Sequence, residues 1–592
     1  MHLVEEDLIL NEIDFFYVFY QQNLRRNDVE ETNTVDHRSR DLVLKERNPK
    51  ANAKDGIKKP TWATNGSDEQ DEEEAQVFIR YYPKAKEVLK KDMYDLDSEY
   101  EDTSPGQSKK FDIKYEFNDL NTYVVTASKG KLKHLMDRSK KNIALVEDDP
   151  VREFAQDHHV MEENVNYAEE SFNYSHRNLQ TSFTDQLTNG QWRPYGVSMV
   201  QAPQVWPYST GEGVKVCVID SGIYRDSPDF VKTNLSGNDT STSIRWYQDA
   251  CGHGTHVSGT IAGKNNNIGV VGVAYNAKIH TIRIFSSGTN GCGRFYASGG
   301  IAATNLCKAA GAKVINMSYQ GENAAATEAS QFQSLYENYG MLSVAAAGNG
   351  EITEAAFPAS YPYVVSVASV DRYSNRAIDS KYNDMVDIAA PGVLVKSVKS
   401  GDSTGYNVET KNGTSMAAPH VSAVAALLFA KFRTSNPKQD VENIRNAMLF
   451  TAQDRGIAGR DHEYGYGIVK AWDAYQCLKI GDCPSCVDDP QGWYDSEGPE
   501  YSCSWYAQDY NCAEYGNDYE NFGKTAKQAC CACNGGAIST CSDSPQGWYD
   551  SDGPTFSCAW YSEGSNCEEF GDSFANFGKT ANQACCVCDG GS

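Results

Sequence analysis

Three short segments, far apart in the chain, carry residues suited to acyl transfer. Asp220 closes the apolar run "VCVID", the segment "CGHGTHVSGT" offers His253 and His256, and Ser415 lies in "NGTSMAAPH". Nucleophilic acyl transfer needs a hydroxyl group, a base that takes its proton, and a carboxylate that orients the base and stabilises its charged form. Glycines and small residues flank all three side chains, which lets a substrate backbone approach closely. These segments therefore predict a Ser-His-Asp site, provided that the fold brings them together.

Each of these residues also has an ordinary structural interpretation. Ser415 precedes the apolar run "VSAVAALLF" and could simply cap a buried helix, although the unpaired N–H groups of a helix start also suit a developing oxyanion. Asn349, in "AAAGNG", could be an ordinary loop asparagine after a strand. His253 and His256 lack the i, i+4 spacing and intervening Glu of a zinc peptidase helix. Both interpretations remain open from these residues alone.

The region from 191 to 477 must position these side chains. Short apolar runs such as "GVKVCVID", "AKVINMSY" and "MLSVAAAGN" suit parallel strands that are buried on both faces. Helical patterns such as "GGIAATNLCKAAG" and "AAPHVSAVAALLFAKF" alternate with them. This alternation predicts an α/β fold built on a doubly wound parallel sheet.

The N-terminal third differs in composition. Residues 1–75 are polar, contain "SDEQDEEEA" and are predicted to be mostly disordered. Residues 76–155 predict a small α+β unit, with strands at "QVFIRYY" and "IALVEDD", two more in "FDIKYEFNDLNTYVVTAS", and a helix at "KGKLKHLMDRSKK". Residues 156–190 form a polar linker.

The 18 cysteines are concentrated in the C-terminal tail, where a segment repeats with a period of 55 residues, from Cys486 to Cys541. Both copies have the same cysteine intervals of 17, 9, 18, 1 and 2 residues, which predicts two disulfide-stabilised modules at 484–536 and 539–592. Zinc binding is the alternative, but a second Cys/His pair at finger-like spacing is missing. Such cysteine density indicates an oxidising compartment.

The pairing of the remaining cysteines is less determined by the sequence. Cys217 is expected to be a buried free thiol, and Cys251, Cys292 and Cys307 could pair in more than one way. Cys477 and Cys483 are expected to attach the α/β region to the tail.

Overall charge and hydropathy exclude two classes of partner. The net charge of −26 argues against nucleic acid binding, and no run approaches the 18 or so apolar residues of a membrane span. The first residues, "MHLVEEDLILNEIDFFYVFYQQNLRR", are too acidic for an evident signal peptide. The cysteines nevertheless predict a secreted protein or one in the secretory lumen.

The tail modules are rich in aromatic residues, among them Trp493, Trp505, Trp548 and Trp560. These could form the small cores that such modules need, or could stack on sugars or dock on a matrix protein. The first interpretation is favoured.

Taken together, the motifs resemble the subtilisin-like serine proteases, peptidase family S8, in the family's order Asp, His, Ser. The resemblance covers about 190–475 and includes "VIDSGI", "HGTHVSGTIAG", "VINMSY", "AAAGN", "DIAAPG" and "NGTSMAAPHVSAVAALL". It implies the three-layer subtilisin-like fold and serine endopeptidase activity on polypeptides. Asp220 would orient His253, His253 would act as base, Ser415 would attack the carbonyl, and Asn349 would complete the oxyanion hole. His256 would be structural.

The resemblance also implies binding sites. Substrate would contact Ser318, Tyr319, Gln320, Ala346, Ala347 and Gly348, and Gln320 replaces a glycine that is usual in the family. A structural calcium ion would be bound by Gln191, Asp229, Asn266 and the carbonyls of Ile268 and Val270. An Asn-rich surface loop is the alternative at this place. No organic cofactor is expected.

Residues 77–154 resemble the inhibitory propeptide of the same family, so the protein is expected to be a monomeric zymogen that is inhibited by its own N-terminal unit and cut within 156–190. Two other functions remain as alternatives: a catalytically inactive homologue, and a matrix- or sugar-binding protein that acts through the tail.

Overall fold

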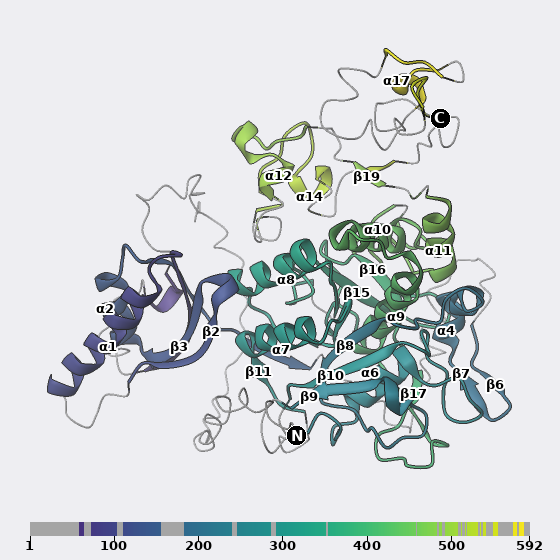
Figure 1. Cartoon of the computed structure of the whole chain (residues 1–592), viewed down its shortest axis with the longest axis horizontal. Coiled ribbons are helices and arrows are strands. Elements are labelled where there is room, and N and C mark those ends of the chain that lie inside the picture. Colours follow the sequence, from purple (N-terminus) through teal and green to yellow (C-terminus); the bar gives the residue numbers. More distant parts are fainter. Residues whose placement is uncertain are drawn as a thin grey trace, which may run out of the picture. The chain divides into compact units, whose positions relative to one another are not determined.

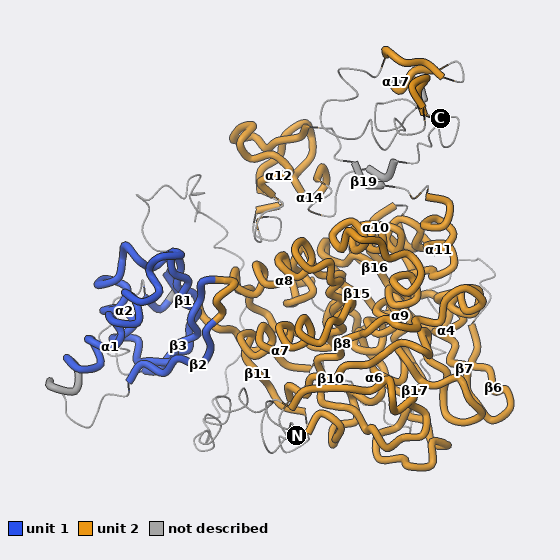
Figure 2. The backbone as a smooth tube through the Cα atoms, viewed as in Figure 1, with its two compact units in different colours: residues 1–116, 121–147, 241–244 blue, residues 117–120, 148–240, 245–592 orange. Residues whose placement is uncertain are grey.

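The computed structural model describes residues 59–63, 73–103, 110–154, 183–239, 245–285, 292–350, 353–457, 459–481 and parts of 483–584. The chain divides into two compact units, one formed by residues 1–116, 121–147 and 241–244 and the other by the remaining residues (Figure 2). Within the segment predicted to be mostly disordered, residues 59–63 and 73–75 are described: Thr61–Ala63 form a 3-10 helix, η1, and β1 begins at Glu74. The rest of 1–75 and most of the predicted linker lie outside the described residues.

The first unit is an α+β fold. Its four-stranded sheet has the order β2-β3-β1-β4, and β1 pairs antiparallel with β3. Val77, Ile79, Leu89 and Leu132 are among the residues that form its core between the sheet and the two helices. The elements are β1 (Glu74–Tyr81), α1 (Lys86–Thr103), β2 (Asp112–Phe117), β3 (Thr122–Ser128), α2 (Lys129–Arg138) and β4 (Ile143–Asp148). The strands and α2 lie where the sequence predicts them, whereas α1 was not predicted because its apolar face is narrow in a highly charged segment.

The second unit is built on a seven-stranded sheet of order β16-β15-β14-β12-β8-β10-β9 (Figure 1). Every neighbouring pair in this sheet is parallel. Its strands are β8 (Lys215–Asp220), β9 (Leu235–Asn238), β10 (Lys278–Arg283), β12 (Val314–Met317), β14 (Leu342–Ala346), β15 (Val364–Val370) and β16 (Ile388–Pro391).

Alternating residues of β8 show how the sheet is covered on both faces. Val216 and Val218 belong to a cluster with α6 (His253–Ala262) and α9 (Thr414–Phe432). Cys217 and Ile219 belong to a second cluster with α7 (Ala297–Ala309) and α8 (Ala326–Tyr339). Successive side chains of a strand point to opposite faces, so helices lie on both sides of the sheet. The predicted three-layer, doubly wound α/β fold is confirmed.

Helix α9 is the one described helix that is long and apolar enough to cross a membrane. However, 83% of its most apolar 18-residue window is buried inside the protein. Its apolar character is therefore explained by its place in the core, against α6 and the central sheet.

A separate three-stranded sheet has the order β11-β5-β13. Here β5 (Val151–Phe154) pairs antiparallel with both β11 (Phe295–Tyr296) and β13 (Tyr319–Gln320). The compact first unit ends at Glu147, and β5 belongs to the second. The other elements of the second unit and tail are η3 (Asn118–Leu120), β6 (Gln186–Thr188), β7 (Gln191–Arg193), α4 (Tyr195–Met199), α5 (Ala202–Val205), η5 (Lys232–Asn234), β17 (Val395–Val398), β18 (Val408–Lys411), α10 (Pro437–Phe450), α11 (Ala471–Ile480), β19 (Ser485–Val487), η6 (Pro499–Tyr501), α12 (Cys503–Tyr506), α14 (Ala526–Ala529), β20 (Ala537–Ser539) and α17 (Ala581–Ala584).

The disulfides correct one expectation from the sequence. Cys217 is not a free thiol but is bonded to Cys307 of α7. That expectation failed because periodicity does not show that α7 packs over the β8 position occupied by Cys217. Cys477 of α11 is bonded to Cys483, so this bridge joins the last helix of the α/β region to the start of the tail.

The described part of the tail contains matching contacts 55 residues apart. The amide of Thr525 donates to Gln528 and that of Thr580 donates to Gln583, at 3.0 and 3.2 Å. In the first copy, Trp493 is 1% exposed and packs with Tyr501, Tyr506 and the Cys503–Cys530 bridge. Trp493 therefore belongs to a small core, whereas Trp548 and Trp560 lie outside the described residues.

The corrected pairing of Cys217 can be tested directly. Replacing Cys217 and Cys307 together by Ala should lower the free energy of unfolding by about 2–4 kcal/mol, because a bridge over a loop of this length restricts the unfolded chain. The measurement is chemical denaturation of a Ser415→Ala form, which avoids self-digestion. An unchanged free energy, or alkylation of Cys217 in the unreduced protein, would contradict the bridge.

Candidate active site

Asp220 and His253 meet where a strand end faces a helix start. Asp220 is the last residue of β8 and His253 is the first residue of α6. The His253 Nδ1 atom lies 2.8 Å from Asp220 Oδ1, and both side chains are buried. Because a carboxylate can only accept here, Nδ1 carries the proton and Nε2 is left as the basic nitrogen.

The close approach of α6 to β8 depends on the residue after His253. A Cβ atom on Gly254 would lie 2.2 Å from the carbonyl oxygen of Gly222 and 3.1 Å from Asp220 Cβ. Any larger residue would push the helix away from the strand. Ser221 joins the same two elements, because its Oγ accepts the Gly254 N–H at 2.9 Å.

Asp249 holds the start of α6 and was missed by the sequence analysis. Its carboxylate accepts the backbone N–H groups of Gly252 and Thr255, each at 2.8 Å, and the hydroxyl groups of Ser221 and Thr255. An aspartate shortly before a helix start was the available signal, since such residues commonly satisfy its unpaired N–H groups. Asp249 therefore positions the helix that carries His253.

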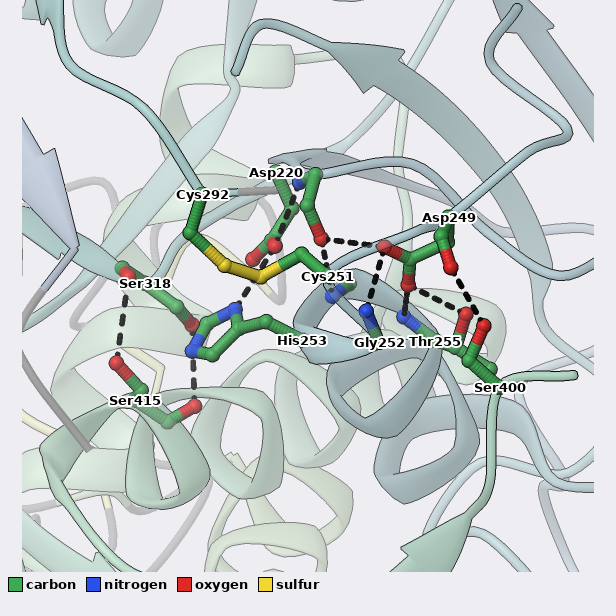
Figure 3. Close-up of a disulfide and its surroundings, with 12 residues drawn as sticks. Asp220, Asp249, Cys251, Gly252, His253, Thr255, Cys292, Ser318, Ser400 and Ser415 are labelled. Atoms are coloured by element: carbon green, nitrogen blue, oxygen red, sulfur yellow. Dashed lines mark hydrogen bonds and ion pairs between the residues drawn. A yellow bond between two sulfur atoms is a disulfide. The ribbon is translucent and has the colours of Figure 1, made fainter. Parts of the chain in front are cut away.

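A disulfide lies beside this network. Cys251, two residues before His253, is bonded to Cys292 (Figure 3). This bond ties the segment between Asp249 and α6 to the chain that leads into β11. It thereby joins the start of α6 to a strand of the three-stranded sheet.

Ser415 is the second residue of α9 and is fully buried. Figure 3 shows the His253 ring between Asp220 and Ser415. The Ser415 hydroxyl donates to the carbonyl of Ser318 at 3.2 Å, and the Ser318 hydroxyl donates to the Ser415 carbonyl at 3.1 Å. The fold thus brings the three predicted residues together, with Ser318 directly beside Ser415.

Asn349 is oriented by the start of the same helix. Its Oδ1 accepts the Thr414 N–H at 3.0 Å and the Thr414 hydroxyl at 2.8 Å. These donors identify the oxygen of the amide, so the NH₂ group points the other way. Gly413, with φ +128°, leaves room for it, because a Cβ there would lie 2.9 Å from Asn349 Nδ2. The arrangement can present a side-chain donor near the N–H groups of the α9 start.

The predicted substrate residues form two neighbouring segments. Tyr319 and Gln320 are β13, next to Ser318, while Ala346 ends β14 and is followed by Ala347 and Gly348. The Gln320 Oε1 atom accepts the Asn349 N–H at 3.1 Å and would lie 2.5 Å from a Cβ at Gly348. Gln320 therefore fills space between the two segments that a glycine would leave open.

The strand β5, which lies between β11 and β13, was also missed by the sequence analysis. In β5, Phe154 pairs with Tyr319 and its ring centroid lies 4.6 Å from that of His253 and 3.6 Å from that of Phe285. The segment "VREF" has no feature that distinguishes it from the end of the first unit. Its place beside His253 is decided by pairing with residues more than 140 positions away.

The predicted calcium ligands also lie together. The Gln191 amide contacts the Lys264 carbonyl at 2.7 Å, Asn266 Oδ1 at 2.9 Å and the Ile268 carbonyl at 3.0 Å. Asp229 accepts N–H groups from Asn266 and Val270, and burial raises the pKa of its carboxyl group to about 8.

One carboxylate, amide oxygens and backbone carbonyls are the donors that calcium prefers. The residues present therefore fit calcium.

His256, on α6, has a structural environment. Its Nε2 atom faces the carbonyl oxygens of Val395 and Glu409 at 3.0 and 3.2 Å. Burial lowers its pKa to about 3, so the ring is neutral at ordinary pH. It joins α6 to β17 and β18.

Comparison with known proteins agrees with this fold and site. The subtilase family model matches residues 211–467. Subtilisin BL of Lederbergia lenta is 38% identical over 285 residues, which cover 47% of this chain and 97% of that protein. Thermitase of Thermoactinomyces vulgaris is 34% identical, covering 48% and 96%.

Among solved structures, fervidolysin from Fervidobacterium pennivorans, a keratinolytic enzyme related to subtilisin, aligns with a TM-score of 0.54 at 26% identity. The alignment covers 71% of this chain and 63% of that one. The chain belongs to the subtilase family and is a subtilisin-like serine endopeptidase, as its sequence predicts.

The role of Asp249 can be tested by Asp249→Ala. We expect the free energy of unfolding to fall by about 1–3 kcal/mol, because several buried donors lose their acceptor. Denaturation in the Ser415→Ala background gives the value. Asp226→Ala is the matched control, since Asp226 is an exposed carboxylate whose loss should change stability by less than about 0.5 kcal/mol. Equal effects of the two substitutions would contradict the role.

Proposed function

We propose that this chain is an exported subtilisin-like endopeptidase that is made as a zymogen. In this proposal Ser415 is the nucleophile and His253 is the general base. Asp220 orients His253, and the side chain of Asn349 donates to the oxyanion. The observation that carries the proposal is the position of β5. An extended segment of the chain itself is paired on both edges and covers the His253 ring, which is how a peptide would bind and how an inhibitory segment would block the site.

The proposed reaction follows from the geometry. His253 Nε2 takes the proton of Ser415 Oγ as that oxygen attacks the substrate carbonyl carbon, and Asp220 stabilises the resulting imidazolium. The N–H of Ser415 at the α9 start and the amide NH₂ of Asn349 donate to the oxyanion. His253 then protonates the leaving amine when the peptide C–N bond breaks, and a water molecule hydrolyses the acyl-enzyme by the same proton transfers.

Residues 76–155 are proposed to be the inhibitory propeptide, 156–190 the linker with the processing site, and 191–477 the peptidase domain. The separate core of the first unit supports this division. Export is supported by the Cys217–Cys307, Cys251–Cys292, Cys477–Cys483 and Cys503–Cys530 bridges, because disulfides persist in oxidising compartments.

The tail, 484–536 and 539–592, is proposed to consist of two modules that fold alike, because contacts recur at the repeat period. Their role would be targeting or binding, including contact with matrix or carbohydrate. The burial of Trp493 removes one candidate for sugar stacking from the first module.

A calcium ion is proposed to be held by Gln191, Asp229, Asn266, Ile268 and Val270. Bound there, it would supply charge neutralisation for the buried Asp229 carboxylate. It would also join β7 to the loop after α6.

The nucleophile is tested by expression and labelling. The wild-type chain should lose residues N-terminal to its processing site, measured by mass spectrometry, and should react with a fluorophosphonate probe. Ser415→Ala should do neither, and His253→Ala should be labelled far more slowly because no base activates the hydroxyl. Asn349→Ala should still be labelled but turn over about 10²–10³-fold more slowly. A processed wild-type protein that does not react with the probe would contradict the endopeptidase assignment of these residues.

Calcium binding is tested by chelation. Calcium that saturates only the native state should raise the melting temperature by about 5–10 °C, and a chelator should remove this gain. Asp229→Asn should abolish the response to calcium, whereas Asp226→Asn should keep it. A wild-type melting temperature that does not depend on calcium would overturn the site.

A further inference from the structure

The strand β5 places an arginine inside the protein. Arg152 pairs with Phe295 of β11 across the small sheet, and its side chain is 0% exposed. Arginine is rarely buried to this extent without a paired anion, since a guanidinium loses strong hydration when it leaves water. Its surroundings therefore contain a specific partner.

That partner is Glu328, in the first turn of α8. Arg152 Nη2 lies 2.5 Å from Glu328 Oε2, and Nε lies 3.4 Å from Oε1. Two roughly parallel contacts of this kind are the fork-to-carboxylate geometry that arginine makes. Burial opposes the charge of Arg152, but the neighbouring Glu328 raises the pKa of the guanidinium above its usual value. The two side chains form a buried, oppositely charged pair.

The Glu328 carboxylate is fixed by the peptidase fold itself. Its side chain is 1% exposed, and the Tyr361 hydroxyl donates to Oε2 at 2.9 Å. Tyr361 is in turn held by the backbone N–H of Ala325, which donates to its hydroxyl at 2.8 Å. None of these three residues lies in β5, so the carboxylate would stay in place when the strand leaves. A buried carboxylate without its cation is costly, which favours entry of another cation.

Gly321 leaves part of the space that the guanidinium occupies. A Cβ atom there would lie 2.5 Å from Arg152 Nη1. The remaining guanidinium nitrogen, Nη1, donates to the Val151 carbonyl at 3.1 Å. The guanidinium therefore contacts Glu328 through Nε and Nη2 and a backbone carbonyl through Nη1.

The register of the sheet relates this pocket to the site of attack. Tyr319 pairs with Phe154, so the residue after Phe154 in an extended peptide would pair with Ser318, which is hydrogen bonded to Ser415. That position is the one presented to the nucleophile. Arg152 stands three residues before it.

We propose that Glu328 makes this endopeptidase select peptides with arginine three residues N-terminal to the residue whose carbonyl is attacked. The inference rests on the proposed function and adds the substrate class. In this proposal Arg152 occupies, within the same chain, the position that the arginine of a preferred substrate would take. Lysine fits less well, because one ammonium group cannot make both contacts of the fork.

The test uses wild-type mature enzyme and two peptides that differ only at this position, with arginine in one and its neutral isostere citrulline in the other. We expect kcat/KM to be about 10–100-fold higher for the arginine peptide, because citrulline leaves the buried carboxylate without a counter-charge. A ratio near one would overturn the proposal.

Glu328→Gln should reduce the ratio to about one by lowering kcat/KM for the arginine peptide. Glu337→Gln is the matched control, because it removes one negative charge from the same helix about 13 Å further along. It should keep the wild-type ratio. Glu328→Gln could fold poorly because the Arg152 charge is left buried. In that case the double variant, Arg152→Gln with Glu328→Gln, removes both charges, and its kcat/KM ratio for the two peptides should also be about one.

A preference for arginine that survives loss of the Glu328 charge would also overturn the assignment. Fluorophosphonate labelling separates this result from failure of the proposed function. Labelled enzyme without arginine preference contradicts only the specificity, whereas unlabelled wild-type enzyme contradicts the catalytic proposal itself.

Discussion

The contact between Asp220 and His253 imposes the tightest constraint on this structure. It requires a helix start to lie against a strand end with room for nothing larger than glycine at position 254. The helix start leaves buried backbone N–H groups that need hydrogen-bond acceptors. The Asp249 carboxylate accepts two of them, from Gly252 and Thr255. The arrangement around His253 is therefore a single packing solution in which strand, helix and preceding loop depend on one another.

The second helix start, that of α9, serves the other half of the site. Thr414 orients Asn349 by two hydrogen bonds, and Ser415 follows immediately. The same helix is buried in the core of the second unit, so the proposed nucleophile and oxyanion donor are attached to a fully packed element. The structural and catalytic interpretations of Ser415 are thus compatible.

The small sheet of β11, β5 and β13 holds one extended segment both by its backbone and by its side chains. Pairing on both edges fixes the backbone of β5, whereas the side chains on one face of that strand enter the protein. Phe154 meets the His253 ring, and Arg152 meets Glu328. The chain thereby displays, in its own sequence, the kind of segment that we propose the cleft accepts.

Most of the fold was predictable because its apolar periodicity and its Asp, His and Ser motifs are local patterns. The strands and α9 followed from runs of apolar residues, and the order of the motifs identified the family. The disulfide of Cys217 was not predictable, because it depends on which helix covers one residue of β8. Glu328 was not recognised either, since a glutamate in a first helical turn ordinarily lies in solvent.

By itself, the sequence therefore determined the fold class, the family and the candidate residues Asp220, His253, Ser415 and Asn349. Tertiary structure alone decided that β5 lies beside His253, that Asp249 supports the His253 helix, and that Glu328 faces Arg152. The physical reason is that propensity and periodicity act over a few residues. Burial of a charge beside its partner depends on segments that are 176 positions apart in the chain and meet only after folding.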